Sequence, residues 1–344
     1  MTDPLTYKST GVDLDAAERA KQSLKALVSD TRDENTLSEL GAFGGLYRVP
    51  SDVDEPVLVS SADGVGTKLK VAFAAGRHHT VGQDLVNHCV NDILVQGARP
   101  LFFLDYLATG ELDEGIVPEV VRGVSLACRE NGCALLGGET AQMPDFYGEG
   151  EYDLAGFIVG VVARNRLIDG AGIEPGDRLL ALPSSGLHTN GYTLARAILF
   201  EHMGLGPDDP FPGTGESVAD TLLKVHRSYL RVIQPLLASG LVKAMAHITG
   251  GGIEGNLPRV LPAGVGAVID ADSWEPPAVF RTLAEGGNVD PGEMFRVFNM
   301  GVGLILAVAP GDEHTALEHL GGEAWSVGHV GPGEGVEFSG SFRM

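Results

Sequence analysis

The sequence predicts an α/β protein with two domains. Short apolar runs, which are typical of strands, alternate with longer amphipathic stretches, which are typical of helices, in both halves of the chain. Between the halves, residues 164–177 contain four glycines or prolines and several charges, a composition typical of an interdomain segment. A length of 344 residues is enough for two hydrophobic cores. We therefore expect one domain over residues 1–168 and a second over residues 169–344.

The first half begins with a polar tail and a helix that Asp13 or Asp15 can cap. Its apolar runs then predict strands at 55–61, 101–108, 133–136 and 154–162, and helical periodicity predicts helices at 79–97 and 115–131. In the second half, strands are expected at 178–182, 244–248, 266–269 and 301–308, with a helix after Gly191 and a longer one over 219–238.

Composition narrows the class of protein. Apolar residues make up 44% and charged residues 20% of the chain, which is the balance of a soluble globular protein. A net charge of −22 argues against nucleic acid or an anionic membrane as the main partner, although a local site can still bind an anionic small ligand. The first eleven residues do not resemble a signal peptide, and three cysteines without C-x-x-C spacing are typical of reduced thiols. These features predict a cytoplasmic protein that binds neither nucleic acid nor membrane.

The segment 59–68, Val-Ser-Ser-Ala-Asp-Gly-Val-Gly-Thr-Lys, is the most informative motif. Asp63 follows an apolar strand and offers a hard oxygen ligand to a metal ion, while Gly64 and Gly66 allow backbone N–H groups to approach phosphate. Lys68 can neutralise charge on a transferring group. The common phosphate-loop order is absent, because Thr67 precedes the lysine. Phosphate binding and a plain strand-to-turn junction fit this motif equally well.

A second polar set lies on the predicted helix 79–97. Its short amide, imidazole and carboxylate side chains suit a fixed site better than a solvated face, and they are Asp84, Asn87, His88, Asn91 and Asp92. Asp92 is the favoured second metal ligand, since two carboxylates from separate elements can share magnesium ions. The alternative is a buried network that ties this helix to its neighbour.

Gly137 and Gly138 follow a predicted strand directly and precede Glu139, which repeats the arrangement around Asp63. Glu139 therefore completes an acidic set with Asp63 and Asp92. A glutamate that caps a helix is an equally good interpretation.

Two loops of the second half also carry candidate residues. Residues 183–191 join a strand to a helix and contain His188, a candidate general acid or base, close to Asn190; a capping histidine is the alternative. Residues 250–255 match Gly-x-Gly-x-x-Gly, but Pro258 interrupts the helix that a dinucleotide site needs. We prefer a glycine-rich helix N-terminus that binds one phosphate monoester, with backbone packing as the alternative.

These segments together resemble the phosphoribosylformylglycinamidine cyclo-ligase family. The resemblance spans nearly the whole chain and rests on long motifs in one order: Tyr7-Lys8 with Gly11-Val12-Asp13, residues 63–68, residues 90–92, residues 96–97, residues 100–106, residues 137–141 with Met143-Pro144, residues 184–186 with His188 and Asn190-Gly191, His247 with residues 249–252, and Phe298-Asn299 with residues 301–303. One departure is Leu187, where the family is expected to have proline; this change removes no reactive group.

The resemblance implies a two-domain ATP-binding synthetase fold in which each domain is a mixed sheet with helices packed on it. It also implies a homodimer whose N-terminal sheets pack across the two-fold axis and share the nucleotide site. The implied reaction belongs to purine biosynthesis. ATP phosphorylates the formyl amide oxygen of formylglycinamidine ribonucleotide, an amidine nitrogen attacks the activated carbon, and phosphate leaves to give 5-aminoimidazole ribonucleotide.

The resemblance also implies roles for individual residues. The expected ATP contacts are Tyr7, Lys8, Gly11, Asp13, Asp63, Gly64, Gly66, Thr67, Lys68, Asn91, Gly137 and Gly138. The expected Mg²⁺ ligands are Asp63, Asp92 and Glu139. The expected catalytic residues are Lys68, His188, Asn190 and His247, and the expected substrate contacts are Ser185, Gly250, Gly251 and Gly252. A small-molecule kinase of the same fold and a nucleotide-sensing module are the alternative functions.

Overall fold

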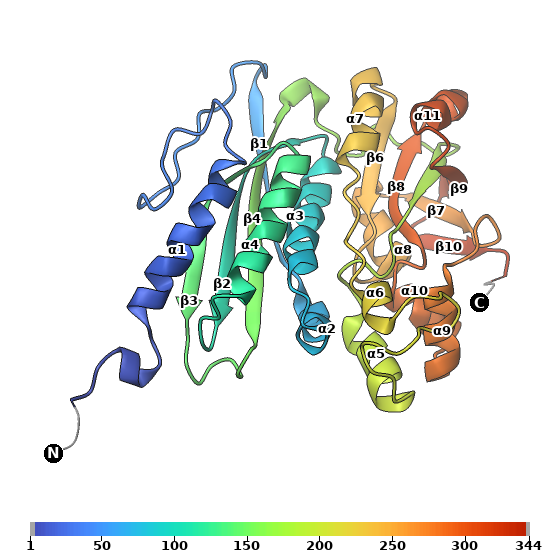
Figure 1. Cartoon of the computed structure of the whole chain (residues 1–344). Helices are drawn as coiled ribbons and strands as arrows, with labels where there is room; N and C mark the ends of the chain where they lie inside the picture. Colours follow the sequence, from blue (N-terminus) through green and yellow to red (C-terminus); the bar gives the residue numbers. More distant parts are fainter. Residues whose placement is uncertain (1–3, 342–344) are drawn as a thin grey trace.

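Two β-sheets, one in each half of the chain, organise the fold (Figure 1). The computed structural model describes residues 4–341. Within these residues, a four-stranded sheet has the order β1-β4-β2-β3 and a six-stranded sheet has the order β10-β7-β9-β5-β8-β6. Each contains parallel and antiparallel neighbours, so the expected α/β fold with mixed sheets is confirmed. The predicted domain boundary after residue 168 falls between the strands of the first sheet and those of the second.

The first sheet is built from β1 (Pro56–Gly64), β4 (Tyr152–Ala163), β2 (Arg99–Thr109) and β3 (Ala134–Gln142). β2 and β3 run parallel, while β4 is antiparallel to both β1 and β2. Figure 1 shows three helices on one face of this sheet: α1 (Leu14–Ser29), α3 (His79–Leu94) and α4 (Ile116–Glu130). β1 and β3 extend past the predicted strands, through Asp63 and Glu139, because the residues that follow each apolar run stay in the extended ladder.

The two faces of the first sheet differ in burial. Leu85, Cys89 and Ile93 of α3 are fully buried, and they pack into the same core as Ile158 of β4. On the face away from these helices, Leu58 remains 57% exposed and Phe157 of β4 remains 46% exposed. Apolar side chains exposed together on a sheet face are typical of a surface that contacts another protein.

The second sheet is larger and more enclosed. Its strands are β5 (Arg178–Pro183), β6 (Val242–His247), β7 (Val265–Asp270), β8 (Val302–Val308), β9 (Trp325–Pro332) and β10 (Val336–Ser339). All seven residues of β8 are buried, as a strand between two partners requires. β9 and β10 lie in a segment for which the sequence analysis made no prediction. The helices around this sheet are α5 (Tyr192–Arg196), α6 (Val218–Leu222), α7 (Leu230–Ser239), α8 (Gly252–Asn256), α9 (Ala278–Gly287), α10 (Pro291–Val297) and α11 (Glu313–His319).

The prediction of one helix over residues 219–238 is wrong. The chain instead forms α6 and α7, separated by an irregular segment at 223–229. Backbone groups of residues 226, 227 and 229 bond to side chains of α3. Helical periodicity cannot reveal this tertiary competition for backbone hydrogen bonds.

Over residues 4–341, each helix is either too short or too polar to cross a membrane.

Candidate active site

α3 lies at the junction between the two halves of the molecule, beside α7 (Figure 1). Its polar stripe forms hydrogen bonds to the segment between α6 and α7. Asp84 accepts a hydrogen bond from the backbone N–H of His226 (2.7 Å), and Asn87 donates to the carbonyl of the same residue (2.8 Å). Asn91 accepts from the N–H of Tyr229 (2.9 Å) and donates to the carbonyl of residue 227 (2.8 Å). These three side chains therefore form the buried network that was the alternative to a ligand site. Asn91 is fully buried, so the structure does not support its expected contact with ATP.

Lys68 also departs from its expected role. Its side chain is fully buried, and Nζ lies 2.8 Å from Oδ2 of Asp84. The same ammonium group donates to the carbonyls of His188 (3.1 Å) and Lys224 (2.8 Å). Burial lowers the pKa of Lys68 and raises that of Asp84, and each group stabilises the charge of the other. With three partners and no exposed surface, Lys68 links the two halves, so the structure does not support its expected contact with a phosphate.

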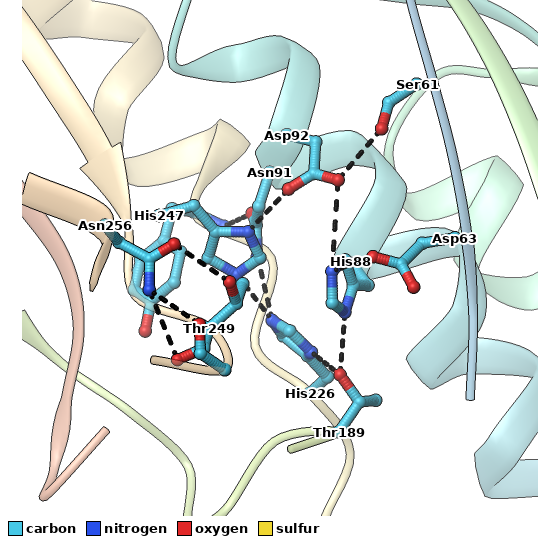
Figure 2. A network of polar contacts seen from close by, with 12 residues as sticks. Ser61, Asp63, His88, Asn91, Asp92, Thr189, His226, His247, Thr249 and Asn256 are labelled. Atoms are coloured by element: carbon cyan, nitrogen blue, oxygen red, sulfur yellow. Dashed lines mark hydrogen bonds and ion pairs between the residues drawn. The ribbon is translucent and has the colours of Figure 1, made fainter. Parts of the chain in front are cut away.

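Asp63 and Asp92 do come together, on either side of His88 (Figure 2). Nε2 of His88 lies 2.7 Å from Oδ2 of Asp63 and 3.9 Å from Oδ2 of Asp92. Ser61 donates a hydrogen bond to the latter oxygen (2.9 Å). The side chains of Asp63 and Asp92 are 40% and 25% exposed, so this cluster is open to solvent where the Lys68 pair is closed.

A chain of polar contacts continues from this cluster into the second half (Figure 2). Nδ1 of His88 contacts Oγ1 of Thr189 (2.7 Å), and Thr189 lies 3.4 Å from Nδ1 of His226. Nε2 of His226 faces Nε2 of His247 (3.0 Å), whose Nδ1 contacts Oδ1 of Asp92 (2.9 Å). The contacts join both carboxylates through side chains from both halves of the molecule.

The groups along these polar contacts differ in the protonation state that their surroundings favour. Burial alone would lower the pKa of His88, but the hydrogen bond to Asp63 and the charges of Asp92 and Asp63 outweigh it and raise that pKa. For Asp63 and Asp92, burial is outweighed by their histidine partners, which lower both pKa values. Burial holds the pKa of His247 below its ordinary value. The two carboxylates therefore favour the protonated form of His88, whereas burial favours the neutral form of His247.

Glu139 does not join this acidic set. Along the sheet, β4 and β2 lie between β1, which carries Asp63, and β3, which carries Glu139. Two intervening strands separate the carboxylates by about 14 Å at ordinary strand spacing. Glu139 is instead exposed in a groove of about 890 Å³, which Gly137, Gly138 and the glycine-rich loop 40–45 also line. The prediction that Glu139 shares a metal ion with Asp63 and Asp92 is therefore wrong for a single chain.

The N-terminal segment that carries expected nucleotide contacts packs against the end of β3. Nζ of Lys8 lies 2.6 Å from a carboxylate oxygen of Asp13, and the backbone N–H of Asp13 donates to Gln142 (2.9 Å). Lys8, Gly11 and Asp13 line a cavity of about 530 Å³. Tyr7 lies beside them with 62% of its surface exposed. The structure brings these residues together at the β3 edge, away from Asp63.

The remaining expected phosphate contacts lie on the turn after β1. Gly64 ends the strand and donates its N–H to Oδ1 of Asp63 (2.6 Å). Gly66 has a left-handed φ of 64°, a conformation that favours glycine. Oγ1 of Thr67 lies 2.9 Å from Oγ1 of Thr193, so this turn also meets the second half.

Loop 184–191 is placed beside the same junction. The N–H of Ser185 donates to Nε2 of His188 (3.1 Å), and the Ser185 hydroxyl donates to the carbonyl of residue 225 (2.6 Å). His188 is buried, and burial together with neighbouring charged groups holds its pKa well below the ordinary value. Asn190 is partly exposed and lies next to Gly250, where an added Cβ would meet its Oδ1 at 3.0 Å. The expected substrate residues of the two loops thus adjoin.

The dinucleotide interpretation of residues 250–255 is wrong. α8 has only five residues, and β6 before it pairs with β8, whereas β7 after it pairs with β9 and β10. The strand–helix–strand unit of a dinucleotide site is therefore missing here. Gly251 and Gly252 have φ values of 96° and 61°, and a Cβ on Gly252 would meet the carbonyl of Phe295 at 1.9 Å. Close backbone packing accounts for Gly252, and the left-handed backbone conformation accounts for Gly251.

Sequence analysis did not identify Thr189 and His226. His226 falls within the wrongly predicted helix, so its place opposite α3 was hidden. The one available signal was the polar run His226-Arg227-Ser228 between apolar neighbours, which interrupts an otherwise helical pattern.

Comparisons with known proteins identify relatives over almost all of the chain. Residues 44–162 match the model of the AIR synthase related protein N-terminal domain, and residues 174–340 match that of the C-terminal domain. A phosphoribosylformylglycinamidine cyclo-ligase of Trichlorobacter lovleyi is 51% identical, with 94% of each chain covered. A protein with the same name from Citrifermentans bemidjiense is 52% identical, with 95% of each chain covered. Another from Myxococcus xanthus is also 52% identical and covers 96% of this chain and 97% of its own.

Solved structures agree at the level of the fold. A thiamine-monophosphate kinase from Stenotrophomonas maltophilia has a TM-score of 0.69 at 20% identity, covering 93% of this chain and 97% of its own. Escherichia coli HypE has a TM-score of 0.66 at 20% identity, covering 93% of each chain. A structure of a hydrogenase maturation protein HypE in complex with ATP has a TM-score of 0.63 at 19% identity, covering 94% of this chain and 88% of its own.

Proposed function

Because this chain belongs to the phosphoribosylformylglycinamidine cyclo-ligase family, we propose that it catalyses the ATP-dependent cyclisation of formylglycinamidine ribonucleotide to 5-aminoimidazole ribonucleotide. The observation that carries this proposal is identity of 51–52% to three such cyclo-ligases over at least 94% of each chain. The residues of the polar cluster at the junction, from both halves of the molecule, lie within the matched segments 44–162 and 174–340. The enzyme is then a carbon–nitrogen ligase of purine biosynthesis.

The chemistry requires activation of a poor leaving group. The terminal phosphoryl group of ATP is transferred to the formyl amide oxygen, which gives ADP. An amidine nitrogen attacks the activated carbon, the carbon–oxygen bond breaks and phosphate leaves with that oxygen. The attacking nitrogen loses a proton, so the products are the imidazole, ADP, phosphate and one proton. Positioning and charge stabilisation are the tasks left to the protein.

We assign the Mg²⁺ ligand role first to Asp63. Its side chain is the more exposed of the two junction carboxylates, and a carboxylate oxygen is the ligand type that Mg²⁺ prefers. The ion supplies neutralisation of phosphate charge when bound. Asp92 is the second ligand in this proposal, although its Oδ1 contacts His247 and its Oδ2 accepts from Ser61. Asn190 and the 250–252 loop face the ribonucleotide in the same proposal, whereas the side chains of His188 and His247 are buried.

We place the nucleotide at the β3 edge. Leu112 borders both the cavity that Lys8, Gly11 and Asp13 line and the groove that Gly137, Gly138 and Glu139 line. Cavities of about 530 and 890 Å³ are within the usual size range of small-molecule sites. The triphosphate is then directed across the end of the sheet toward Asp63, where Gly64 ends β1 and Gly66 and Thr67 follow it.

We also propose a homodimer formed through the open face of the first sheet, where Leu58 and Phe157 are exposed. Light scattering coupled to size exclusion should give twice the chain mass for the wild type and the chain mass for Phe157→Glu. A wild-type monomer at micromolar concentration contradicts this assembly. A cytoplasmic location accompanies the proposal, because all three cysteines are buried free thiols.

Product analysis tests the activity. Purified protein, ATP, Mg²⁺ and formylglycinamidine ribonucleotide should yield one ADP and one phosphate for each imidazole formed, measured by chromatography and the absorbance of the imidazole. A phosphorylated ribonucleotide that persists, with ADP but no imidazole, supports the kinase alternative. ATP bound without turnover in the presence of the ribonucleotide supports the sensing module.

A further inference from the structure

One carboxyl of the first sheet lies among apolar side chains. Alternate residues of a strand share a face, so β2 directs Phe103, Asp105 and Leu107 to the same side of the sheet. Phe103 and Leu107 are buried in the core that includes Leu85 of α3, which places Asp105 on the face that the helices cover. The carboxyl of Asp105 makes no hydrogen bond or ion pair with another residue among residues 4–341. An enclosed polar group of this kind costs free energy until a partner satisfies it.

Gly138 of β3 fixes where this carboxyl lies. The two residues are register partners in neighbouring parallel strands, and a Cβ at Gly138 would meet Oδ1 of Asp105 at only 2.2 Å. The carboxyl therefore lies against the backbone of β3, in space that a glycine leaves open. Asp105 and Gly138 both line the groove of about 890 Å³, and Asp105 remains partly exposed. The carboxyl is thus accessible from the groove.

The described surroundings offer this carboxyl no compensating charge. Burial raises the pKa of Asp105 to about 7, and only a hydrogen bond from its own backbone opposes the rise. In either protonation state the carboxyl has an oxygen that can accept a hydrogen bond, and the protonated form can also donate one. A ligand that satisfies this group therefore needs a hydrogen-bond donor, and an acceptor beside that donor completes the match.

The rest of the groove suits an apolar ring. Apolar side chains from α1, α4, β3 and the chain after β2 line it: Leu24, Val28, Val121, Leu135 and Leu112. Among the described residues, the charged side chains that line it are all acidic, which disfavours a phosphate group there; they are Glu18, Glu39, Asp105 and Glu139. A neutral ring with a polar edge fits these features better than a phosphate does.

We propose that Asp105 binds the Watson–Crick edge of the ATP adenine and selects a 6-aminopurine. This inference rests on the proposed function, because that function supplies ATP as the nucleotide. The 6-amino group donates to a carboxyl oxygen of Asp105, and the protonated carboxyl donates to N1 of the ring. The apolar side chains of the groove then contact the faces of the base. Asp105 is thus a specificity residue and takes no part in phosphoryl transfer.

Removal of the 6-amino group provides a direct probe. Purine riboside triphosphate has hydrogen in place of that group, and calorimetry with Mg²⁺ gives its affinity and that of ATP without any need for turnover. Wild-type protein should bind the analogue about 10-fold more weakly than ATP, since an enclosed acceptor loses its donor. Asp105→Leu should bind the two nucleotides within about 2-fold of each other, because the partner of the amino group is gone. Asp105→Asn keeps an acceptor oxygen and gains a donor, so it should retain most of the preference.

Asp153→Leu is the matched control, because Asp153 is exposed on the neighbouring strand β4 and lies outside the described lining of the groove. It should keep the wild-type preference. Equal affinity of wild-type protein for the two nucleotides overturns the proposal, as does Asp105→Leu protein of unchanged circular dichroism that keeps the preference. Loss of the preference in Asp153→Leu as well also overturns it. If Asp105→Leu misfolds, Asp105→Ala is judged by the same criterion.

The binding measurement separates this inference from the proposed activity. A protein that binds ATP with this preference but forms no imidazole contradicts the cyclisation and leaves the role of Asp105 intact. A protein that forms the imidazole but binds both nucleotides equally contradicts the role of Asp105 alone.

Discussion

Two clusters of acidic and basic side chains lie one helical turn apart on α3, and they differ in access to solvent. Asp84 pairs with Lys68, and neither side chain has exposed surface. Four residues later, His88 lies between Asp63 and Asp92, which are 40% and 25% exposed. The closed cluster bonds to backbone carbonyls of the second half, whereas the open one presents carboxylate oxygens toward solvent. The two clusters contain similar residues, but their burial differs. The buried Lys68–Asp84 pair is therefore structural, whereas the partly exposed cluster around His88 is a candidate for chemistry.

The largest effect is expected from breaking the closed cluster. Lys68→Met leaves Asp84 as a buried charge without its partner, which should lower the free energy of unfolding by about 3–5 kcal/mol in urea titrations followed by circular dichroism. Lys70→Met is the matched control, because Lys70 pairs with Glu151 at the surface and should cost about 1 kcal/mol or less. Recovery of most of the stability in Lys68→Met/Asp84→Met is the second expected result. A single-variant loss below about 1 kcal/mol contradicts the structural role.

A smaller loss is expected from Asn91→Leu, which removes the hydrogen bonds to the 227 carbonyl and to the N–H of Tyr229. Buried backbone groups left without partners should cost about 2–3 kcal/mol in the same titration. Asn165→Leu, at an exposed position, should change stability by less than about 0.5 kcal/mol. Equal effects of the two substitutions would show that α3 does not hold the 223–229 segment.

The contribution of the open cluster to the free energy of unfolding should depend on pH. The pKa of His88 is raised in the folded state, so its contribution is complete below about pH 6.5 and is lost as pH rises through the folded value. The pKa of Asp63 is lowered, so its contribution is complete above about pH 4 and is lost on further acidification. His88→Gln should therefore cost about 1 kcal/mol between these limits and less at pH 9. A cost that grows with pH contradicts the charged pair.

The sequence predicted one cluster better than the other. Asp63 and Asp92 were chosen because their residue types suit a metal ion, and the structure brings them to the same histidine. Lys68 was misassigned, because local sequence does not reveal that its ammonium group is enclosed by residues more than a hundred positions away. Glu139 shares the strand-end pattern of Asp63, but strand order, which places β3 at the other edge, cannot be read from that pattern.

Secondary-structure prediction likewise succeeded where the signal is local and failed where tertiary contacts decide. Apolar runs located eight strands, since burial leaves a local signature, although most of their ends shifted by one or more residues. The helix over 219–238 failed because its backbone partners belong to α3. Local pattern thus gives the elements, while contacts across the junction decide which elements survive and which side chains stay accessible.

Asp63→Asn tests the division between the clusters most directly, when ATP turnover and urea unfolding are measured on the same preparation. Turnover should fall at least about 100-fold at saturating Mg²⁺, while the free energy of unfolding changes by less than about 1 kcal/mol because the side chain is partly exposed. Retained turnover, or a loss of stability as large as that of Lys68→Met, contradicts a chemical role for the open cluster.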